Sequence, residues 1–154
     1  MTLEVHGLEP IVSDLAAMSR RTHQLRPLLS RIAVVAEQGA RANLQSSGRR
    51  NAAGWPPLHP MTIAIRRSYG DTRLAPLLRD GSLLDSIRAA PSGEGVEVIA
   101  AHEAAALVQE GGRAPGPGGR GTVVIPARPF LVPAVPDLDQ MANAGARFVV
   151  EGAR

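Results

Sequence analysis

The 154-residue sequence contains no cysteine, which excludes disulfides, thiolate zinc sites and a cysteine nucleophile. It contains no lysine either, so a phosphate-binding loop of the G-x-x-x-x-G-K-[ST] type is excluded. No apolar run approaches the length of a membrane span, and the first ten residues lack the basic and apolar regions of a signal peptide. We therefore expect a soluble protein without a membrane partner, which is made and used in the cytoplasm or leaves the cell by lysis.

Aromatic residues are scarce, at 3% of the chain, whereas hydrophobic residues as a whole reach 44%. A chain of this length and apolar content can form one globular domain, and we expect a single domain over residues 1–154. Its core must be built from Leu, Ile, Val and Ala, which makes it thin. Association with further copies would strengthen it.

Every one of the 17 basic residues is arginine, although the net charge is only +3. A coding bias explains such a composition, and intersubunit pairing, for which the guanidinium fork is suited, is a compatible explanation. The arginine pairs 49–50 and 66–67, and Arg113 with Arg120, could also contact phosphate groups. A small arginine-rich nucleic-acid-binding module is therefore the alternative function, although no helix-turn-helix, RRM or zinc-finger signature supports it.

The spacing of apolar residues predicts an α+β fold with N-terminal helices, a small and mostly antiparallel sheet that includes a β-hairpin, and a C-terminal helix. Two segments interrupt the pattern: a long loop at 46–60 that carries the only Trp, and a Gly-rich flexible tip at 111–121. The expected elements are strands at 2–7 and 122–127, a hairpin of 82–90 with 96–101 around a turn at 91–95, and helices at 9–24, 27–48, 60–68, 102–112 and beyond 133.

Three of the helices have a predicted apolar face, because their apolar residues recur at intervals of three and four. Glu37 and Arg41 are expected to form an i,i+4 ion pair on another face of the second helix. The predicted apolar residues are Ile11, Leu15 and Met18 in the first helix, Leu28, Ile32, Val35, Ala36, Ala40 and Leu44 in the second, and Val135, Leu138, Met141, Ala142 and Phe148 in the last.

The sequence contains partial matches to nucleotide-binding and metal-binding motifs, but their spacing or context does not fit. Residues 116–121 match G-x-G-x-x-G, but a strand rather than a helix follows, so a hairpin tip is the better interpretation. The zincin motif that His102 and Glu103 begin would need a second His where Ala106 stands. The four histidines have no ligand spacing and are expected to be surface or cap residues. We find no catalytic, metal or cofactor site.

Four stretches occur in an order that is characteristic of one family. They resemble the motifs G-x-x-W-x-P-L-S-x-x-T, L…T-G-x-L-x-x-S-I, Y-A-x-x-H-x-x-G and I-P-A-R-P-F-L-G of the phage virion morphogenesis, or tail-completion, family of tailed bacteriophages and Mu-like prophages. The resemblance covers about residues 25–145. The stretches are GWPPLHPMT (Gly54–Thr62), LLRDGSLLDSI (Leu77–Ile87), EAAALVQEGG (Glu103–Gly112) and IPARPFL (Ile125–Leu131).

The chain departs from these motifs at a few positions. His59 stands where Ser is common and Asp80 where Thr is usual, while Ala105 replaces a Tyr, and Val108 or Gln109 a His. The third motif is therefore the least complete.

The resemblance implies a structural subunit of the head–tail junction or tail end of a virion, with no enzymatic activity and no cofactor. It implies a homo-oligomeric ring, six-fold to match the tail, assembled in the host cytoplasm. The expected partners are further copies of the chain and other neck and tail proteins, with genomic DNA passing through the ring without sequence-specific binding. Tail-terminator, tail-completion and neck roles all stay open.

Twelve residues of these motifs are the expected assembly or structural residues. Arg128, stiffened by Pro126 and Pro129, reaches either a carboxylate on a neighbouring element or subunit, or a partner within its own chain. Trp55 pins the long loop to its own domain, with anchoring on a partner as the alternative. The residues are Trp55, Pro57, Leu58, Thr62, Gly81, Leu83, Ile87, Gly111, Arg128, Pro129, Phe130 and Leu131.

Overall fold

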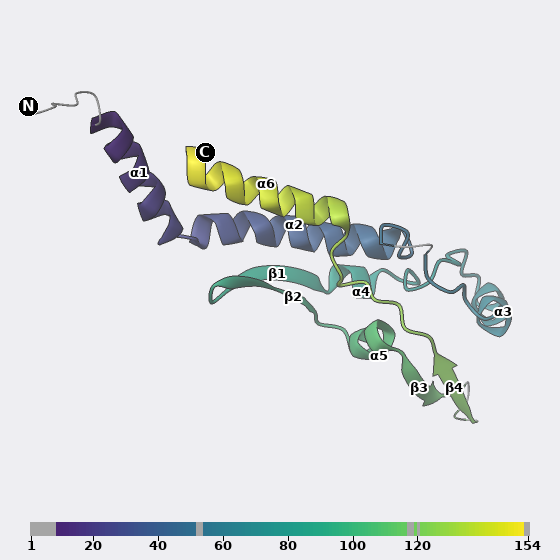
Figure 1. The fold of residues 1–154 in the computed structure, drawn as a ribbon. Helices are drawn as coiled ribbons and strands as arrows, with labels where there is room; N and C mark the ends of the chain where they lie inside the picture. The colour runs from purple at the N-terminus through teal and green to yellow at the C-terminus, as the bar shows by residue number, and fades with distance from the viewer. Residues whose placement is uncertain (1–8, 52–53, 117–118, 120, 153–154) are drawn as a thin grey trace, which may run out of the picture.

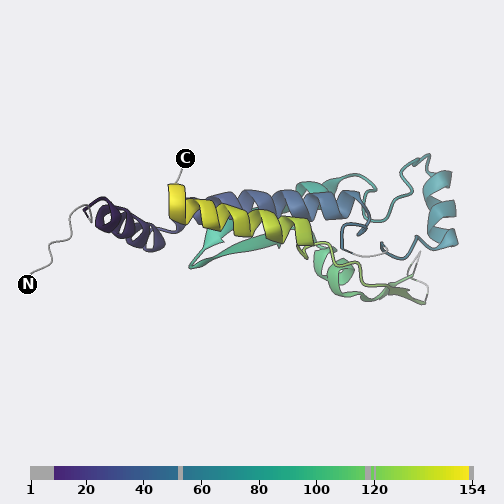
Figure 2. The same cartoon turned by 45° about the horizontal axis from the view of Figure 1, so that its top comes forward.

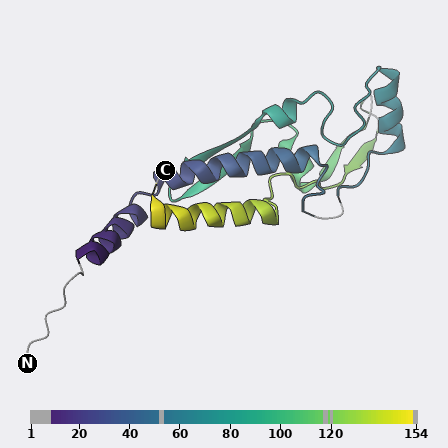
Figure 3. The same cartoon turned by 90° about the horizontal axis from the view of Figure 1, so that it is seen from above.

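A computed structural model of the chain describes residues 9–51, 54–116, 119 and 121–152, so the strand expected at 2–7 lies outside the described residues. The molecule is elongated (Figures 1 and 3): helix α1 projects from one end, and helix α3 lies at the other end beside the hairpin β3–β4. Its helices are α1 (Glu9–Thr22), α2 (Arg26–Gln45), α3 (Pro60–Ser68), α4 (Ser82–Asp85), α5 (Ala105–Glu110) and α6 (Val135–Glu151), and its strands are β1 (Ile87–Ser92), β2 (Gly95–Ala100), β3 (Gly112–Pro115) and β4 (Thr122–Ile125).

The architecture confirms the α+β prediction, with helices at both ends of the chain and antiparallel strands between them. Proline at the first or second position begins α2, α3 and α6, where its missing N–H costs no hydrogen bond. The start of α3 is further capped by His59, whose Nδ1 accepts a hydrogen bond from Met61 N at 3.2 Å. None of the helices in the described part of the chain is long and apolar enough to cross a bilayer.

The strands form two separate two-stranded sheets. In the first, β1 pairs with β2 from Ile87 opposite Ala100 to Ser92 opposite Gly95, which confirms the expected hairpin. The prediction of an extended run from residue 82 was wrong, because residues 82–85 form the helical turn α4 and the strand begins at Ile87.

The second sheet corrects the expected flexible tip at 111–121. Residues 112–115 form β3, which pairs with β4 from Gly112 opposite Ile125 to Pro115 opposite Thr122. Pairing with the β-branched residues of β4 orders this part of the Gly-rich segment. The turn between the two strands is only partly described, since residues 117, 118 and 120 lie outside the described residues.

Helix α2 forms the axis of the fold (Figures 1 and 2), with α6 along one side and the β1–β2 hairpin along another. The helix therefore buries two faces, whereas the sequence predicted one. Ala40 and Leu44 are buried as expected, but Leu29 and Ala33 are buried as well. A single stripe of 3.6-residue periodicity describes a helix with one neighbour, not a helix between two layers.

The exposed edge of β1 is bonded by side chains of α2. Glu37 Oε2 accepts a hydrogen bond from Ala89 N at 3.0 Å, and Arg41 Nη2 donates to Ile87 O at 3.1 Å. The two side chains also form the predicted i,i+4 ion pair, with Arg41 Nε 3.2 Å from Glu37 Oε1. Helix and hairpin are thus joined by polar contacts in addition to apolar packing.

Helix α6 packs on α2 through a different face from the one predicted. Phe148 is buried as expected, but Val135 and Leu138 are 69% and 49% exposed, and Asp137 is buried. Asp137 explains the rotation, because its carboxylate caps the start of α6 at Ala134 N and turns toward α2. Helix α1 is held chiefly by the end of α6, where Arg21 Nη1 donates to Val149 O at 2.8 Å and Val150 O at 2.6 Å.

Candidate functional site

The four motif stretches, which are far apart in the sequence, meet in one core cluster beside the C-terminal half of α2. We call this cluster the motif junction. The second, third and fourth stretches each supply buried side chains, and Trp55 of the first packs against them. Its buried members are Ala40, Leu44, Leu83, Ile87, Ala105, Val108 and Phe130.

Arg128 lies at the motif junction with only 6% of its surface exposed. Its Nη2 donates to Pro56 O at 3.1 Å and to Pro57 O at 3.4 Å, and its own N–H donates to Val108 O at 2.8 Å. Burial, with a smaller contribution from the charge of Arg66, lowers the pKa of the guanidinium. Of the two arrangements considered for Arg128, the structure shows the one within its own chain.

Arg128 therefore holds two carbonyls of the long loop. A charged donor that is buried against carbonyl oxygens stabilises them more than a neutral donor would. The loop covers the guanidinium and leaves little of it accessible, and a contact of Arg128 with a neighbouring subunit stays an untested alternative.

The segment that follows Arg128 is fixed by two amide side chains that the sequence analysis did not select. Gln109 Oε1 accepts hydrogen bonds from Phe130 N at 2.9 Å and Leu131 N at 3.2 Å. Asn43 Nδ2 donates to Pro129 O at 3.3 Å and Phe130 O at 3.4 Å. The available signals were the polar Asn43 between buried apolar positions of α2, and Gln109 near the position where the family motif has His.

The long loop at 46–60 is tied to the rest of the chain along its described length. Arg50 forms an ion pair with the buried Asp137, and Asn51 Nδ2 donates to Val132 O at 3.0 Å. Trp55 N donates to Ser47 O at 2.9 Å, and the indole lies against Gly48, where a Cβ would collide with it. The indole also packs against the core cluster, so Trp55 has the intramolecular position that the sequence favoured.

The remaining predicted residues lie around the junction. Leu83 and Ile87 are buried at 5% and 0% exposure, while Leu58 and Thr62 are half-buried and Pro57 is exposed. Leu131 is half-buried beside the core cluster.

Both glycines among the predicted residues have a positive φ, which favours glycine. Gly81 precedes α4 at φ +89°, and Gly111 ends α5 at φ +76°. Gly111 is also crowded, because a Cβ there would lie 2.7 Å from Ala127 N. This close approach brings the end of α5 against the Arg128 segment.

Two arginines of the pairs considered for phosphate contact are engaged within the chain. Arg50 pairs with Asp137, and Arg66 Nη1 donates to Arg73 O at 2.8 Å and Ala75 O at 3.2 Å. Arg120 lies outside the described residues.

Two histidines accept hydrogen bonds from nearby backbone N–H groups. His59 caps α3, and His102 Nδ1 accepts from Ala104 N at 3.1 Å in the turn before α5. Among the residues that the structure describes, no three His, Asp or Glu side chains gather into a group that could hold a metal ion.

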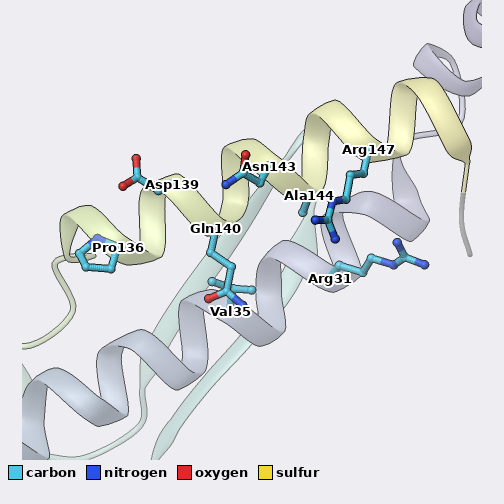
Figure 4. Close-up of a pocket in the computed structure, with 8 residues that line it drawn as sticks. All are labelled: Arg31, Val35, Pro136, Asp139, Gln140, Asn143, Ala144 and Arg147. Carbon is cyan, nitrogen blue, oxygen red and sulfur yellow. The ribbon is translucent and has the colours of Figure 1, made fainter.

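Two of the surface grooves run between packed elements. One, of about 720 Å³, lies between α3 and the β3–β4 hairpin and is largely apolar. The other, of about 610 Å³, follows the line where α6 lies on α2 (Figure 4). In the second groove Gln140 points toward Val35, while Arg31 and Arg147 come from the two helices at the same end.

The comparison with known protein families covers all the segments that form the motif junction. A family model described as the phage virion morphogenesis family matches residues 4–145, which include all four motif stretches. No curated protein and no solved structure matches the chain significantly.

Proposed function

Because the chain belongs to the phage virion morphogenesis family, we propose that it is a structural subunit of the head–tail junction or tail end of a virion. In this role it assembles as a ring that completes the tail and connects it to the head. DNA is thereby retained in the particle and later passes through the ring. The subunit performs no catalysis, and its partners are further copies of itself and the neighbouring neck and tail proteins.

The position of the family motifs carries this proposal. Their side chains pack into the motif junction and hold the long loop, so the characteristic residues of the family build a scaffold. An enzyme of this size would instead gather reactive side chains in a cleft. A particle subunit needs a fixed shape to present to its neighbours, and the junction supplies it.

The surface of the single chain supports association. Large apolar side chains remain exposed on α1 and around the groove between α3 and β4, including Leu15, Met61 and Val124 at 60%, 61% and 70%. Exposed apolar residues that gather on a surface, as Met61 and Val124 do at the groove, mark interaction sites. A ring would bury part of this surface in contacts that head-to-tail symmetry repeats around the axis.

The proposal is tested in the phage or prophage whose genome encodes the chain. Without the chain, we expect DNA-filled heads and free tails in place of joined particles, and the purified chain should restore joining when it is added. Native mass spectrometry should give the mass of a closed ring, either for the free protein or for the protein on isolated tails. Normal yields of infectious, joined particles without the chain would overturn the proposal.

The same preparation separates this proposal from the nucleic-acid-binding alternative. A nucleic-acid-binding module should bind duplex DNA with an affinity that falls steeply as salt rises, because its arginines release counterions. A ring held by apolar contacts should keep its mass at high salt. The ion pair of Arg50 with Asp137 speaks against the alternative, because it neutralises one of the arginines that a nucleic-acid-binding module would need.

A further inference from the structure

Helix α1 presents an apolar stripe that the described part of the chain leaves exposed. Ile11, Val12 and Leu15 are 55%, 61% and 60% exposed, and their i, i+1, i+4 spacing places them on one side of the helix. Isolated helices of this length are marginal in water, and packing of the apolar face supplies most of their stability. The stripe therefore calls for a partner.

A complementary surface lies at the opposite end of the molecule (Figures 1 and 3). It is the groove of about 720 Å³ between α3 and the β3–β4 hairpin. Met61 and Val124 on its walls are 61% and 70% exposed, and Ile65 and Ile125 line it as well. A helix with an apolar stripe is the shape that such a groove accepts.

The charges of the two ends are also complementary. In the part of α1 that carries the stripe, Glu9 and Asp14 are acidic, and the two arginines of the helix, Arg20 and Arg21, lie in its last turn. Beside the groove, residues 60–79 contain four arginines against one aspartate, and Arg113 lies on β3. The acidic part of α1 is therefore favoured at a surface of opposite charge.

We propose that α1 of one copy docks in the groove between α3 and the β3–β4 hairpin of the next copy. This inference rests on the proposed function, since it names the contact that would build the ring. The two surfaces lie at opposite ends and differ from each other, so the contact is head-to-tail. A head-to-tail contact closes into a ring when its rotation closes.

The absence of cysteine allows a direct test in the full chain. The double variant Leu15→Cys/Val124→Cys places one thiol on the stripe and one at the groove. On mild oxidation we expect a ladder of covalent oligomers on non-reducing gels, which collapses to monomer on reduction. The matched control is Leu15→Cys/Ile99→Cys, because Ile99 is 50% exposed on β2, away from the groove. The control should give no ladder.

A second variant tests the contact without disulfide formation. Leu15→Asp places a carboxylate in the apolar stripe and should weaken self-association at least tenfold in analytical ultracentrifugation. Val34→Asp, at a 55% exposed position of α2, is the matched control and should leave self-association unchanged.

The outcomes distinguish this inference from the proposed function. Joined particles that depend on the chain, together with no ladder from Leu15→Cys/Val124→Cys, would overturn the docking of α1 and leave the virion role standing. A ladder from that variant, together with particles that join without the chain, would support the docking and overturn the virion role. Equal ladders from the test pair and the control pair would also overturn the docking.

Discussion

The carboxylate of Asp137 lies directly over Gly39 of α2, so a Cβ added to Gly39 would come within 2.6 Å of Asp137 Oδ2. The same carboxylate caps α6 through Ala134 N at 3.0 Å and pairs with Arg50 of the long loop. The absence of a side chain at position 39 thus lets one acid connect α2, α6 and the loop. The relative positions of α2, α6 and the long loop therefore depend on the close contact between Gly39 and Asp137.

Gly39→Ala should therefore destabilise the fold, although alanine is ordinarily the better helix former. Displacing Asp137 should cost about 2–3 kcal/mol of unfolding free energy, as overpacking of a core does. Urea denaturation measures this loss of unfolding free energy. Gly145→Ala in α6 is the matched control, because nothing lies within 4 Å of its added Cβ, and it should stabilise by about 0.5–1 kcal/mol. Stabilisation by both substitutions would contradict the role of Asp137.

Arg128→Ala should destabilise the isolated monomer by about 2–4 kcal/mol, because the carbonyls of Pro56 and Pro57 lose a charged, buried donor. Release of the loop should also speed trypsin cleavage after Arg50. Arg147→Ala, at an exposed position of α6, should change stability by less than about 0.5 kcal/mol. A variant at Arg128 that keeps its monomer stability and loses only assembly would restore the intersubunit role.

Gln109→Leu should cost about 2–4 kcal/mol, since it leaves the N–H groups of Phe130 and Leu131 without their acceptor. Gln109→Glu keeps an acceptor oxygen in the same place, as a carboxylate, and should lose much less stability. Thermal or urea unfolding of the two variants side by side gives the comparison. Equal losses would show that the acceptor oxygen does not account for the stabilisation.

The carboxyl of Asp80 should titrate below its ordinary pKa of 3.8, chiefly because it accepts hydrogen bonds from the Ser82 hydroxyl and the Ser82 N–H. The lowered pKa means that this contribution to stability is complete above pH 3.8 and is lost as the pH falls through the lower, folded-state pKa. NMR titration of the Asp80 carboxyl measures this pKa, and Ser82→Ala should raise it toward the ordinary value. A native pKa at or above 3.8 would contradict the two hydrogen bonds from Ser82.

Local signals made several elements of the fold predictable. Pro60 and the polar residues after Ile65 define α3, and the positive-φ Gly111 ends α5 where the sequence indicated. The β1–β2 hairpin follows from two extended runs around a glycine turn. In each case the determining residues are neighbours in the chain.

The errors have a common cause, which is contact between distant segments. The rotation of α6 depends on Asp137 meeting Gly39, and β3 exists because it pairs with β4. The positions of Asn43 and Gln109 at the Arg128 segment depend on the same kind of contact. The motifs did identify the residues of the junction, but only the fold shows that Arg128 faces its own loop.

The side chains of Glu37 and Arg41 on the edge of β1 have a consequence for solubility. A two-stranded sheet ordinarily offers its unpaired edges as templates on which further chains add strands and aggregate. Here the ion-paired side chains of α2 occupy Ala89 N and Ile87 O, so that edge cannot recruit a foreign strand at these positions. The chain is thereby protected from amyloid-like stacking along this part of β1.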